Sequence, residues 1–143
     1  ERRSCLVGSE MCIRDSPKLL SSDLSLISDQ RIKFAGQITG VEGYVESAST
    51  GLLSGLLMYN KLKVREQRPP PKTTAMGSLI SYITRKDHVK DFQPMNINFG
   101  LFENMDIRDI RKKPKRIRDM EKKIRISQRA ESDLNKWLNS SFV

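Results

Sequence analysis

Three glycines at short intervals, Gly36, Gly40 and Gly43, constrain the fold of this chain more than any other feature. They lie in the segment FAGQITGVEGYVE, residues 34–46, where β-type residues give way to a helical pattern. Glycine accepts positive φ and close backbone approach, and a helix start presents unpaired N–H groups. The segment predicts a strand over about residues 32–35, then a turn and a helix that together hold a phosphate or a flavin edge. Turns of this kind also occur where nothing binds.

The glycine-rich turn is followed by a long helical pattern over residues 42–62. Apolar residues recur there at helical spacing. They are Val45, Ala48, Leu52, Leu56 and Tyr59, with Leu53 and Leu57 widening the stripe. Ser47, Gly51 and Gly55 are four positions apart, and we attribute this small-residue stripe to close packing in the core.

Two further helices are predicted after a proline-rich connector. The prolines at 69–71 cannot continue a helix. Thr73 or Thr74 is a suitable cap for a helix that runs to about residue 82 or 84. A basic helix is predicted over about residues 114–139, with Trp137 in its last turns docked on the body of the protein.

The positive charge of the chain is concentrated in this last part. The net charge is +9, and residues 108–129 contain eleven Lys or Arg against three acidic residues. A surplus of this kind suggests a nucleic-acid partner, with a solvated helix face as the alternative. The candidate contacts are Lys112, Lys113, Lys115 and Arg116.

A second polar motif lies in the segment FQPMNINFGL, residues 92–101. Asn96 and Asn98 are two positions apart, so in an extended chain they share one face. Their amides both donate and accept hydrogen bonds, which suits the edge of a pterin, flavin or uracil ring. The alternative is that they satisfy backbone groups in a turn.

The two motifs together resemble the C-terminal part of the folate- and FAD-dependent tRNA (uracil-5-)-methyltransferases, the TrmFO family. The resemblance runs from about Pro17 to at least Phe102 and includes PKLL at 17–20, YVESA at 44–48, TAMG at 74–77 and YIT at 82–84. It implies an α/β fold class, in which residues 17–103 form the incomplete C-terminal part of a glutathione-reductase-type FAD-binding domain. Residues 104–143 then form a basic helical tail.

The resemblance also implies a reaction and a set of cofactors. A methylene group from methylenetetrahydrofolate is transferred to C5 of a T-loop uridine in tRNA, reduced FAD supplies the hydride, and NAD(P)H re-reduces the flavin. The implied FAD-binding residues are those of the turn: Gly36, Gln37, Gly40, Val41, Glu42, Gly43 and Tyr44. Val41, Glu42 and Gly43 are expected to donate backbone N–H groups, and Tyr44 to pack on the flavin or folate or in the core.

Parts of the family's machinery are not found in this sequence. The resemblance implies a cysteine that activates the uracil by covalent addition and a Gly-x-Gly-x-x-Gly turn that holds the FAD pyrophosphate. No such glycine turn is present in this sequence. The two cysteines, Cys5 and Cys12, lie in residues 1–16, which resemble a translated sequencing adapter and are expected to be disordered. We therefore expect no catalytic residue in this chain, and a missing N-terminal part of the same protein as a partner. No metal site is indicated, no apolar run is long enough to span a membrane, and a cytoplasmic location is expected.

Two alternatives belong to other groups of proteins. One is a small basic RNA-binding module without catalysis, but such a module has no need of a flavin-type turn, and the tail lacks interleaved aromatic residues for base stacking. The other is the sister family of glucose-inhibited division proteins, which has a similar turn. The amino-acid sequence of residues 92–101 resembles the methyltransferases more closely than this sister family.

Overall fold

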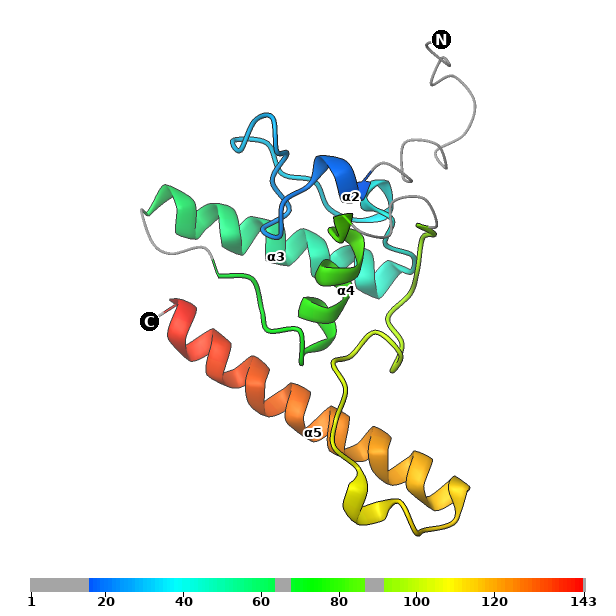
Figure 1. Cartoon of the computed structure of the whole chain (residues 1–143). Coiled ribbons are helices and arrows are strands. Elements are labelled where there is room, and N and C mark those ends of the chain that lie inside the picture. Colours follow the sequence, from blue (N-terminus) through cyan, green and yellow to red (C-terminus); the bar gives the residue numbers. More distant parts are fainter. Residues whose placement is uncertain (1–15, 64–67, 87–91, 143) are drawn as a thin grey trace.

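The protein is described here by a computed structural model, which covers residues 16–63, 68–86 and 92–142. Its described elements are, in order, α2 (Ser16–Leu19), η1 (Gln37–Thr39), α3 (Tyr44–Leu62), α4 (Ala75–Ile83), η3 (Arg108–Ile110) and α5 (Lys115–Phe142). Figure 1 shows α3 and α4 crossing at the centre, with α5 running along one side of them. The predicted disorder of the adapter-like segment concerns residues 1–16, of which residues 1–15 lie outside the described part and Ser16 begins α2.

The prediction of an α/β fold was wrong. The described residues are mostly helical, and their β-pairing is limited to isolated bridges without a sheet. In the predicted strand at 32–35, only Lys33 pairs, in a single antiparallel bridge with Ser25. A strand needs a neighbouring backbone to satisfy its N–H and C=O groups, and the described chain supplies none beyond this bridge.

The second helix begins where the sequence predicted. The side chain of Thr74 caps α4 by accepting a hydrogen bond of 3.1 Å from the N–H of Gly77. A Cβ atom at Gly77 would lie 2.0 Å from the carbonyl oxygen of Pro71, so the proline connector packs directly on the first turn of α4. The run of prolines therefore has a structural role in this contact, since its fixed φ angles hold the connector extended.

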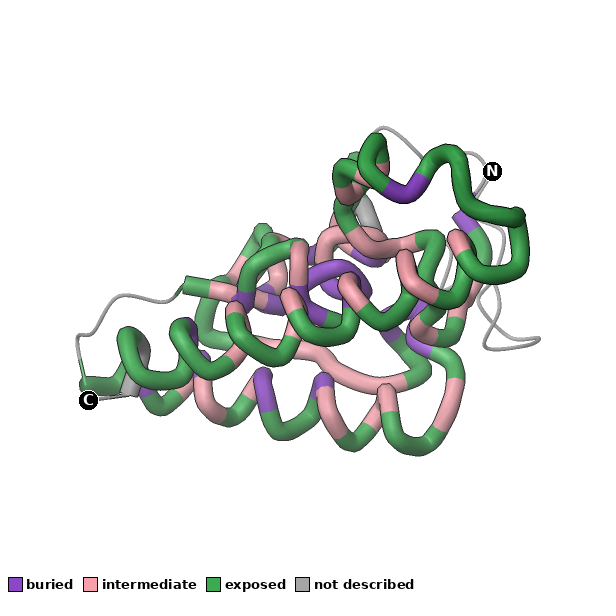
Figure 2. The backbone as a smooth tube through the Cα atoms, turned by 90° about the horizontal axis from the view of Figure 1, so that it is seen from below, coloured by how far each residue is buried: buried purple, intermediate pink, exposed green. Residues whose placement is uncertain are grey.

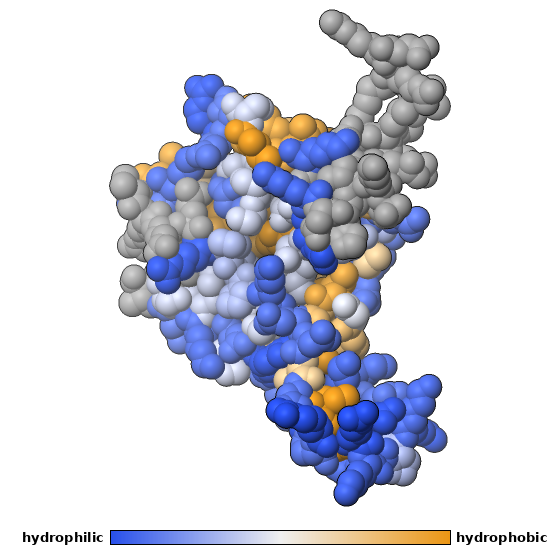
Figure 3. All heavy atoms as spheres, in the orientation of Figure 1, coloured by the Kyte–Doolittle hydropathy of each residue, from blue (hydrophilic) through white to orange (hydrophobic). Residues whose placement is uncertain are grey.

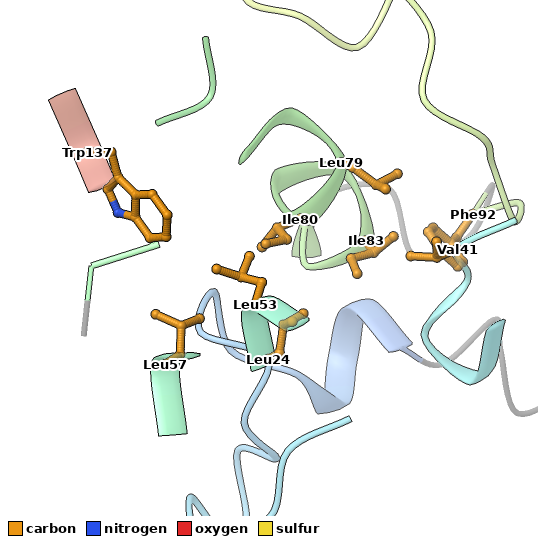
Figure 4. Packing of buried hydrophobic residues seen from close by; sticks show 9 residues of the cluster. All are labelled: Leu24, Val41, Leu53, Leu57, Leu79, Ile80, Ile83, Phe92 and Trp137. Carbon is orange, nitrogen blue, oxygen red and sulfur yellow. The ribbon is translucent and has the colours of Figure 1, made fainter. Parts of the chain in front are cut away.

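A single hydrophobic core joins these helices. Leu53 and Leu57 of α3 pack with Ile80 and Ile83 of α4, and Figure 4 shows these side chains with the others of the cluster. The remaining buried members are Leu24, Val41, Leu79, Phe92 and Trp137. Figure 2 shows that buried residues gather in the interior, while the helices turn exposed residues outward.

The predicted core face of α3 was wrong in its orientation. Leu53 and Leu57, expected only to widen the stripe, are fully buried, together with Thr50 and Asn60. Val45 and Leu52, from the predicted core stripe, are 76% and 65% exposed. Several apolar residues surround this helix, so periodicity alone did not determine which of its sides faces the rest of the described chain.

A partly buried ion pair organises the chain before the glycine-rich turn. The ammonium of Lys33, only 4% exposed, lies 2.7 Å from the carboxylate of Asp23 and 2.9 Å from the hydroxyl of Ser25. Partial burial raises the pKa of Asp23, but hydrogen bonds from Lys33, Ser21 and Ser25 outweigh it and hold the pKa well below its ordinary value. This cluster keeps residues 21–33 folded back on themselves.

The basic helix α5 docks on the body at two places. Near its end, the indole N–H of buried Trp137 donates to the carbonyl oxygen of Arg68 at 2.9 Å, as the predicted docking requires, and Thr73 donates to Asp133 at 2.7 Å. Near its middle, Arg129 donates to the carbonyl oxygen of Glu103 at 2.6 Å. Figure 1 shows the first turns of α5 and the loop before them extending beyond the other helices.

Candidate functional site

The glycine-rich turn is held on α3 by backbone and threonine contacts. All three glycines have positive φ, namely 75° at Gly36, 83° at Gly40 and 93° at Gly43. The N–H of Gly36 donates to the buried hydroxyl of Thr50, at 3.1 Å, which fixes the start of the turn to the second turn of α3. The predicted left-handed backbone is therefore present, and the turn leads directly into the helix.

The structure brings the two sequence motifs together. Val41 and Met95 form a parallel bridge, in which the N–H of Glu42 donates to Met95 at 3.1 Å and the N–H of Met95 donates to Gly40 at 3.0 Å. Residues 40–42 and the segment from 94 to 98 thus lie side by side. Neither motif carries a sequence signal that predicts this pairing.

Gly43, Glu46 and Asn96 form the closest contact between the motifs, which we call the motif junction. A Cβ atom at Gly43 would lie 2.2 Å from Oε2 of Glu46 and 2.8 Å from Nδ2 of Asn96. Oε1 of Glu46 accepts a hydrogen bond of 3.3 Å from the N–H of Ile97. Glu46 was not among the predicted site residues, although a glutamate three residues after a helix cap is a known first-turn signal.

The first turn of α3 is open to solvent. Gly43 is its N-cap and provides no side-chain hydrogen bond, while Tyr44 and Val45 are 92% and 76% exposed. N–H groups in a first turn have no intrahelical acceptor, so those of Tyr44 and Val45 are suited to an anionic or polar ligand edge. The N–H of Glu42, one of the three expected donors, is instead bonded to Met95.

The remaining predicted residues of the turn and of the second motif differ in their surroundings. Gln37 is exposed and begins η1, and Val41 is buried in the core. The amide of Asn98 is used within its own turn, because its Oδ1 accepts from the N–H of Gly100 at 2.9 Å and its Nδ2 donates to the carbonyl of Asn96 at 3.2 Å. Asn96 is the one of the two asparagines that faces the glycine-rich turn.

A small apolar cavity of about 140 Å³ lies beside the motif junction. It is lined from α3, from α4 and from the second motif, by Val45, Glu46, Ser49, Thr50, Ala75, Met76, Leu79 and Ile97. The carboxylate of Glu46 is the one charged group in this lining, and it is bonded to Ile97. The cavity lining offers too few polar groups without a hydrogen-bond partner to indicate a particular ligand.

Of the four predicted tRNA contacts, Lys112 and Lys113 lie in the turn before α5 and Lys115 and Arg116 in its first turn, and Lys113 is paired within the protein. Lys113 forms an ion pair of 2.6 Å with Glu121, and this ammonium, followed by the guanidinium of Arg125, lowers the pKa of Glu121. Lys112, Lys115 and Arg116 are exposed and form no ion pair among the described residues. Figure 3 shows a predominantly hydrophilic surface on the protruding lower part of the molecule.

The neighbouring charges also shape this surface. Arg125 lies 2.7 Å from both Asp109 and Glu121, and its hydrogen bonds lower the pKa of Asp109. The carboxylates of Asp109 and Glu121 are therefore each paired with a cation, and Asp119 lies 4.0 Å from Arg118. Lys112, Lys115 and Arg116 stay exposed and give this end of the helix its positive charge, while the ammonium of Lys123 lies 5.6 Å from the centre of the Phe99 ring.

Comparison with known proteins identifies the origin of these motifs. A relative from Myxococcus xanthus strain DK1622 is 46% identical over 90% of this chain, and one from Hyphomonas neptunium is 48% identical over 90% of it. Both are named methylenetetrahydrofolate–tRNA-(uracil-5-)-methyltransferase TrmFO. The chain belongs to the TrmFO family. A relative from Novosphingobium aromaticivorans, with the same name, is 44% identical over 87% of the chain.

The similarity covers only part of the length of each relative. This chain spans 27% of the Myxococcus protein, 25% of the Novosphingobium protein and 29% of the Hyphomonas protein. The model of a second family, described as glucose inhibited division protein A, matches residues 9–66 and so includes the glycine-rich turn but not the second motif. The relatives cover both motifs, in agreement with the preference for the methyltransferases over the sister family.

Two further observations concern the described residues only. None of the helices among them is long and apolar enough to cross a membrane. No group of three or more His, Cys, Asp or Glu side chains among them is arranged to hold a metal ion.

Proposed function

We propose that this chain supplies one wall of the flavin site in an enzyme that methylates C5 of a T-loop uridine in tRNA. The observation that carries this proposal is the glycine-rich turn with three positive φ angles, opening α3 in a chain that is 46% identical to a named TrmFO protein. When bound, reduced FAD would supply the hydride and methylenetetrahydrofolate the one-carbon unit. The catalytic cysteine and dinucleotide turn of such an enzyme would come from another part of the protein.

The first turn of α3 fits the pyrimidine edge of a flavin. The N–H groups of Tyr44 and Val45 in this first turn, together with the positive end of the α3 dipole, would stabilise the negative charge of a reduced flavin near N1 and O2. Gly36, Gln37 and Gly40 belong to the turn that leads the chain into this end of α3. Tyr44, at 92% exposure, offers a ring that makes no core contact and is free to pack on the flavin or the folate.

Asn96 is proposed to act from the second motif. The Val41–Met95 bridge places this side chain beside Gly43, next to the helix end that would face the flavin. Its amide is suited to hydrogen bonds with a pterin, flavin or uracil edge. We assign Asn98 to the support of the turn around Asn96 and Gly100, because both ends of its amide are bonded there.

The test of the flavin assignment uses a hybrid enzyme in which this chain replaces the matching segment of the Myxococcus relative. Tyr44→Ala should reduce flavin retention or folate-dependent tRNA methylation without lowering the helix content of the chain, because Tyr44 contacts no core residue. Tyr44→Phe is the matched control and should retain both properties. Equal flavin content and equal methylation in Tyr44→Ala and the parent hybrid would refute the role of Tyr44.

We also propose that the start of α5 contacts tRNA phosphates. Replacing Lys112, Lys115 and Arg116 by Gln should weaken tRNA binding at low salt and reduce the slope of log affinity against log salt concentration by about 2 to 3, if each cation contacts one phosphate. Lys136→Gln, at a paired cation elsewhere on α5, is the control and should leave the slope unchanged. An unchanged slope in the triple variant would exclude this end of α5 from the RNA site.

A further inference from the structure

The second motif supplies an exposed aromatic ring to the basic helix, which lacks interleaved aromatic residues of its own. The rings of Phe99 and Phe102 are stacked, with centroids 5.8 Å apart and an angle of 28° between their planes. Phe99 is 43% exposed. The ammonium of Lys123, from α5, lies 5.6 Å from the centre of the Phe99 ring. The structure thus brings together a ring and a cation that are far apart in the sequence.

Phe99 is held in position from both sides. Before it, the carbonyl oxygen of Asn98 accepts a hydrogen bond of 3.1 Å from the N–H of Leu101, which closes a turn around Phe99. After it, Leu101 packs against the hydrophobic core, and Arg129 of α5 donates to the carbonyl oxygen of Glu103 at 2.6 Å. A ring fixed in this way loses little conformational freedom when a ligand packs on it.

A shallow groove extends from Lys123 along the first half of α5. It has a volume of about 590 Å³ and is lined by Lys115, Arg116, Asp119, Met120 and Lys123. Three of these side chains are cations, and Met120, 60% exposed, adds an adaptable apolar contact. Figure 3 shows an apolar spot surrounded by hydrophilic side chains on the protruding lower part of the molecule. Because Lys123 belongs to both the groove and the ring contact, the two form one surface.

The groups of this surface match the two ends of a nucleotide. A nucleobase is planar and stacks on an aromatic ring whatever its identity, and its phosphate requires a nearby cation. The contact of an exposed ammonium with a ring is weaker than such stacking. The flexible side chain of Lys123 can therefore leave the ring of Phe99 to a base and turn its ammonium toward the phosphate.

We propose that Phe99 is a stacking platform for an unpaired nucleobase of tRNA, and that Lys123 neutralises the phosphate of the same nucleotide. The inference rests on the proposed contact of α5 with tRNA and adds to it a residue that binds a base. Bases within an RNA duplex are already stacked and paired, so the platform takes a base from a loop or an end. Stacking tolerates any base, so Phe99 contributes affinity and position but not the choice of nucleotide.

Two RNA probes that differ only in their bases test the platform. One is a labelled oligouridylate of about 12 nucleotides, and the other is the same ribose–phosphate strand without bases. Binding to the 143-residue chain is measured by fluorescence anisotropy. Phe99→Leu, which keeps an apolar side chain, should weaken oligouridylate binding about ten-fold and leave binding of the abasic strand unchanged. Phe99→Tyr keeps the ring and should retain both affinities.

A matched control comes from a second exposed aromatic–lysine pair. Tyr59 of α3 is 48% exposed, and the ammonium of Lys63 lies 5.9 Å from the centre of its ring. This pair lies outside the lining of the groove on α5. Tyr59→Leu should therefore change the affinity for neither probe.

Two further variants separate the charge from the ring and do not depend on a loss of affinity. Lys123→Gln should reduce the slope of log affinity against log salt concentration by about 0.7 for both probes, whereas Phe99→Leu should leave the slope unchanged. The indole introduced by Phe99→Trp should lose fluorescence with oligouridylate but not with the abasic strand. Trp137 is buried, and its emission is measured in the parent chain as the background. In the hybrid with the Myxococcus relative, Phe99→Leu should weaken tRNA binding by a similar factor.

Four outcomes would overturn the proposal. Equal losses for both probes in Phe99→Leu, or equal fluorescence of Phe99→Trp with either probe, would show that no base stacks on this ring. An unchanged salt slope in Lys123→Gln would exclude its ammonium from the phosphate. Unchanged tRNA binding by the Phe99→Leu hybrid would exclude the platform from the tRNA site.

The platform and the phosphate contacts proposed for α5 fail separately. If the variant with Gln at 112, 115 and 116 keeps the parent's salt slope while Phe99→Leu shows the base-dependent loss, the phosphate contacts are refuted and the platform is supported. If that triple variant lowers the slope and Phe99→Leu binds both probes like the parent chain, the platform alone is refuted.

Discussion

Replacing Gly43 by alanine tests the motif junction in the greatest detail. Gly43 has φ 93° and ψ 145°, a conformation that residues other than glycine adopt at a cost of about 1–3 kcal/mol. The new Cβ would also lie 2.2 Å from Oε2 of Glu46, so this side chain has to move and release the N–H of Ile97. Loss of that long, half-buried hydrogen bond costs about 1 kcal/mol. The total expected destabilisation is about 2–4 kcal/mol.

A double-mutant cycle separates the two contributions. In a Glu46→Ala background the collision with the carboxylate is absent, so the further cost of Gly43→Ala should fall by about 1 kcal/mol, and the backbone strain and the close contact with Asn96 should remain. The free energies of unfolding are measured by urea denaturation, followed by far-ultraviolet circular dichroism. Gly51→Ala is the control, and because its Cβ meets open space in the middle of α3, it should stabilise the chain by about 1 kcal/mol.

The result also bears on the interpretation of glycine variants at this site. If Gly43→Ala leaves the free energy of unfolding unchanged, the positive φ and the close approach of Glu46 are refuted together. If its cost is the same with and without Glu46, the motif junction is not formed as described. A Gly43→Val variant that loses flavin would not locate the flavin, because a valine side chain disrupts the turn itself.

Two further predictions concern the stability of the fold. Trp137→Phe keeps an aromatic ring in the core but removes the indole donor to Arg68, and it should lower the free energy of unfolding by about 1–2 kcal/mol in urea denaturation; a variant as stable as the parent would contradict this anchor of α5. Asp23 has a folded-state pKa below the ordinary value of 3.8, so its stabilising effect is present above pH 3.8 and is lost as the pH falls further. When the free energy of unfolding is measured as the pH is lowered, Asp23→Asn should make it fall less steeply below pH 3.8. Asp106→Asn, which removes an exposed ion pair, should change this pH dependence little. An equal effect of the two substitutions would refute the stabilising role of the cluster around Lys33.

The sequence predicted the helices well because their signals are local. Thr74 identified the start of α4, the proline run marked the connector before it, and the long periodic segments gave α3 and α5 to within a few residues. The glycine-rich turn was predictable for the same reason. Closely spaced glycines followed by a helical pattern indicate positive φ angles without knowledge of distant residues.

The predicted strand and the predicted core face of α3 failed because both depend on partners. Lys33 lies where the sequence favours a strand, but the described chain offers it only the single bridge to Ser25. On α3 two apolar stripes compete, and the contacts with α4 bury Leu53 and Leu57 and leave Leu52 outside. Periodicity shows that a helix has apolar faces, but it does not show which neighbour covers each of them.

The amino-acid sequence by itself determined the local structure of this protein and its membership of the TrmFO family. Helix caps, turns and sequence motifs are all properties of short segments. Only the tertiary structure decided that the segment around Asn96 packs against the glycine-rich turn. It also decided that Glu46 accepts a hydrogen bond from that segment, and that the N–H of Glu42 donates to the carbonyl oxygen of Met95. These contacts join residues about fifty positions apart. No short segment encodes such contacts, because they depend on how distant parts of the chain pack together.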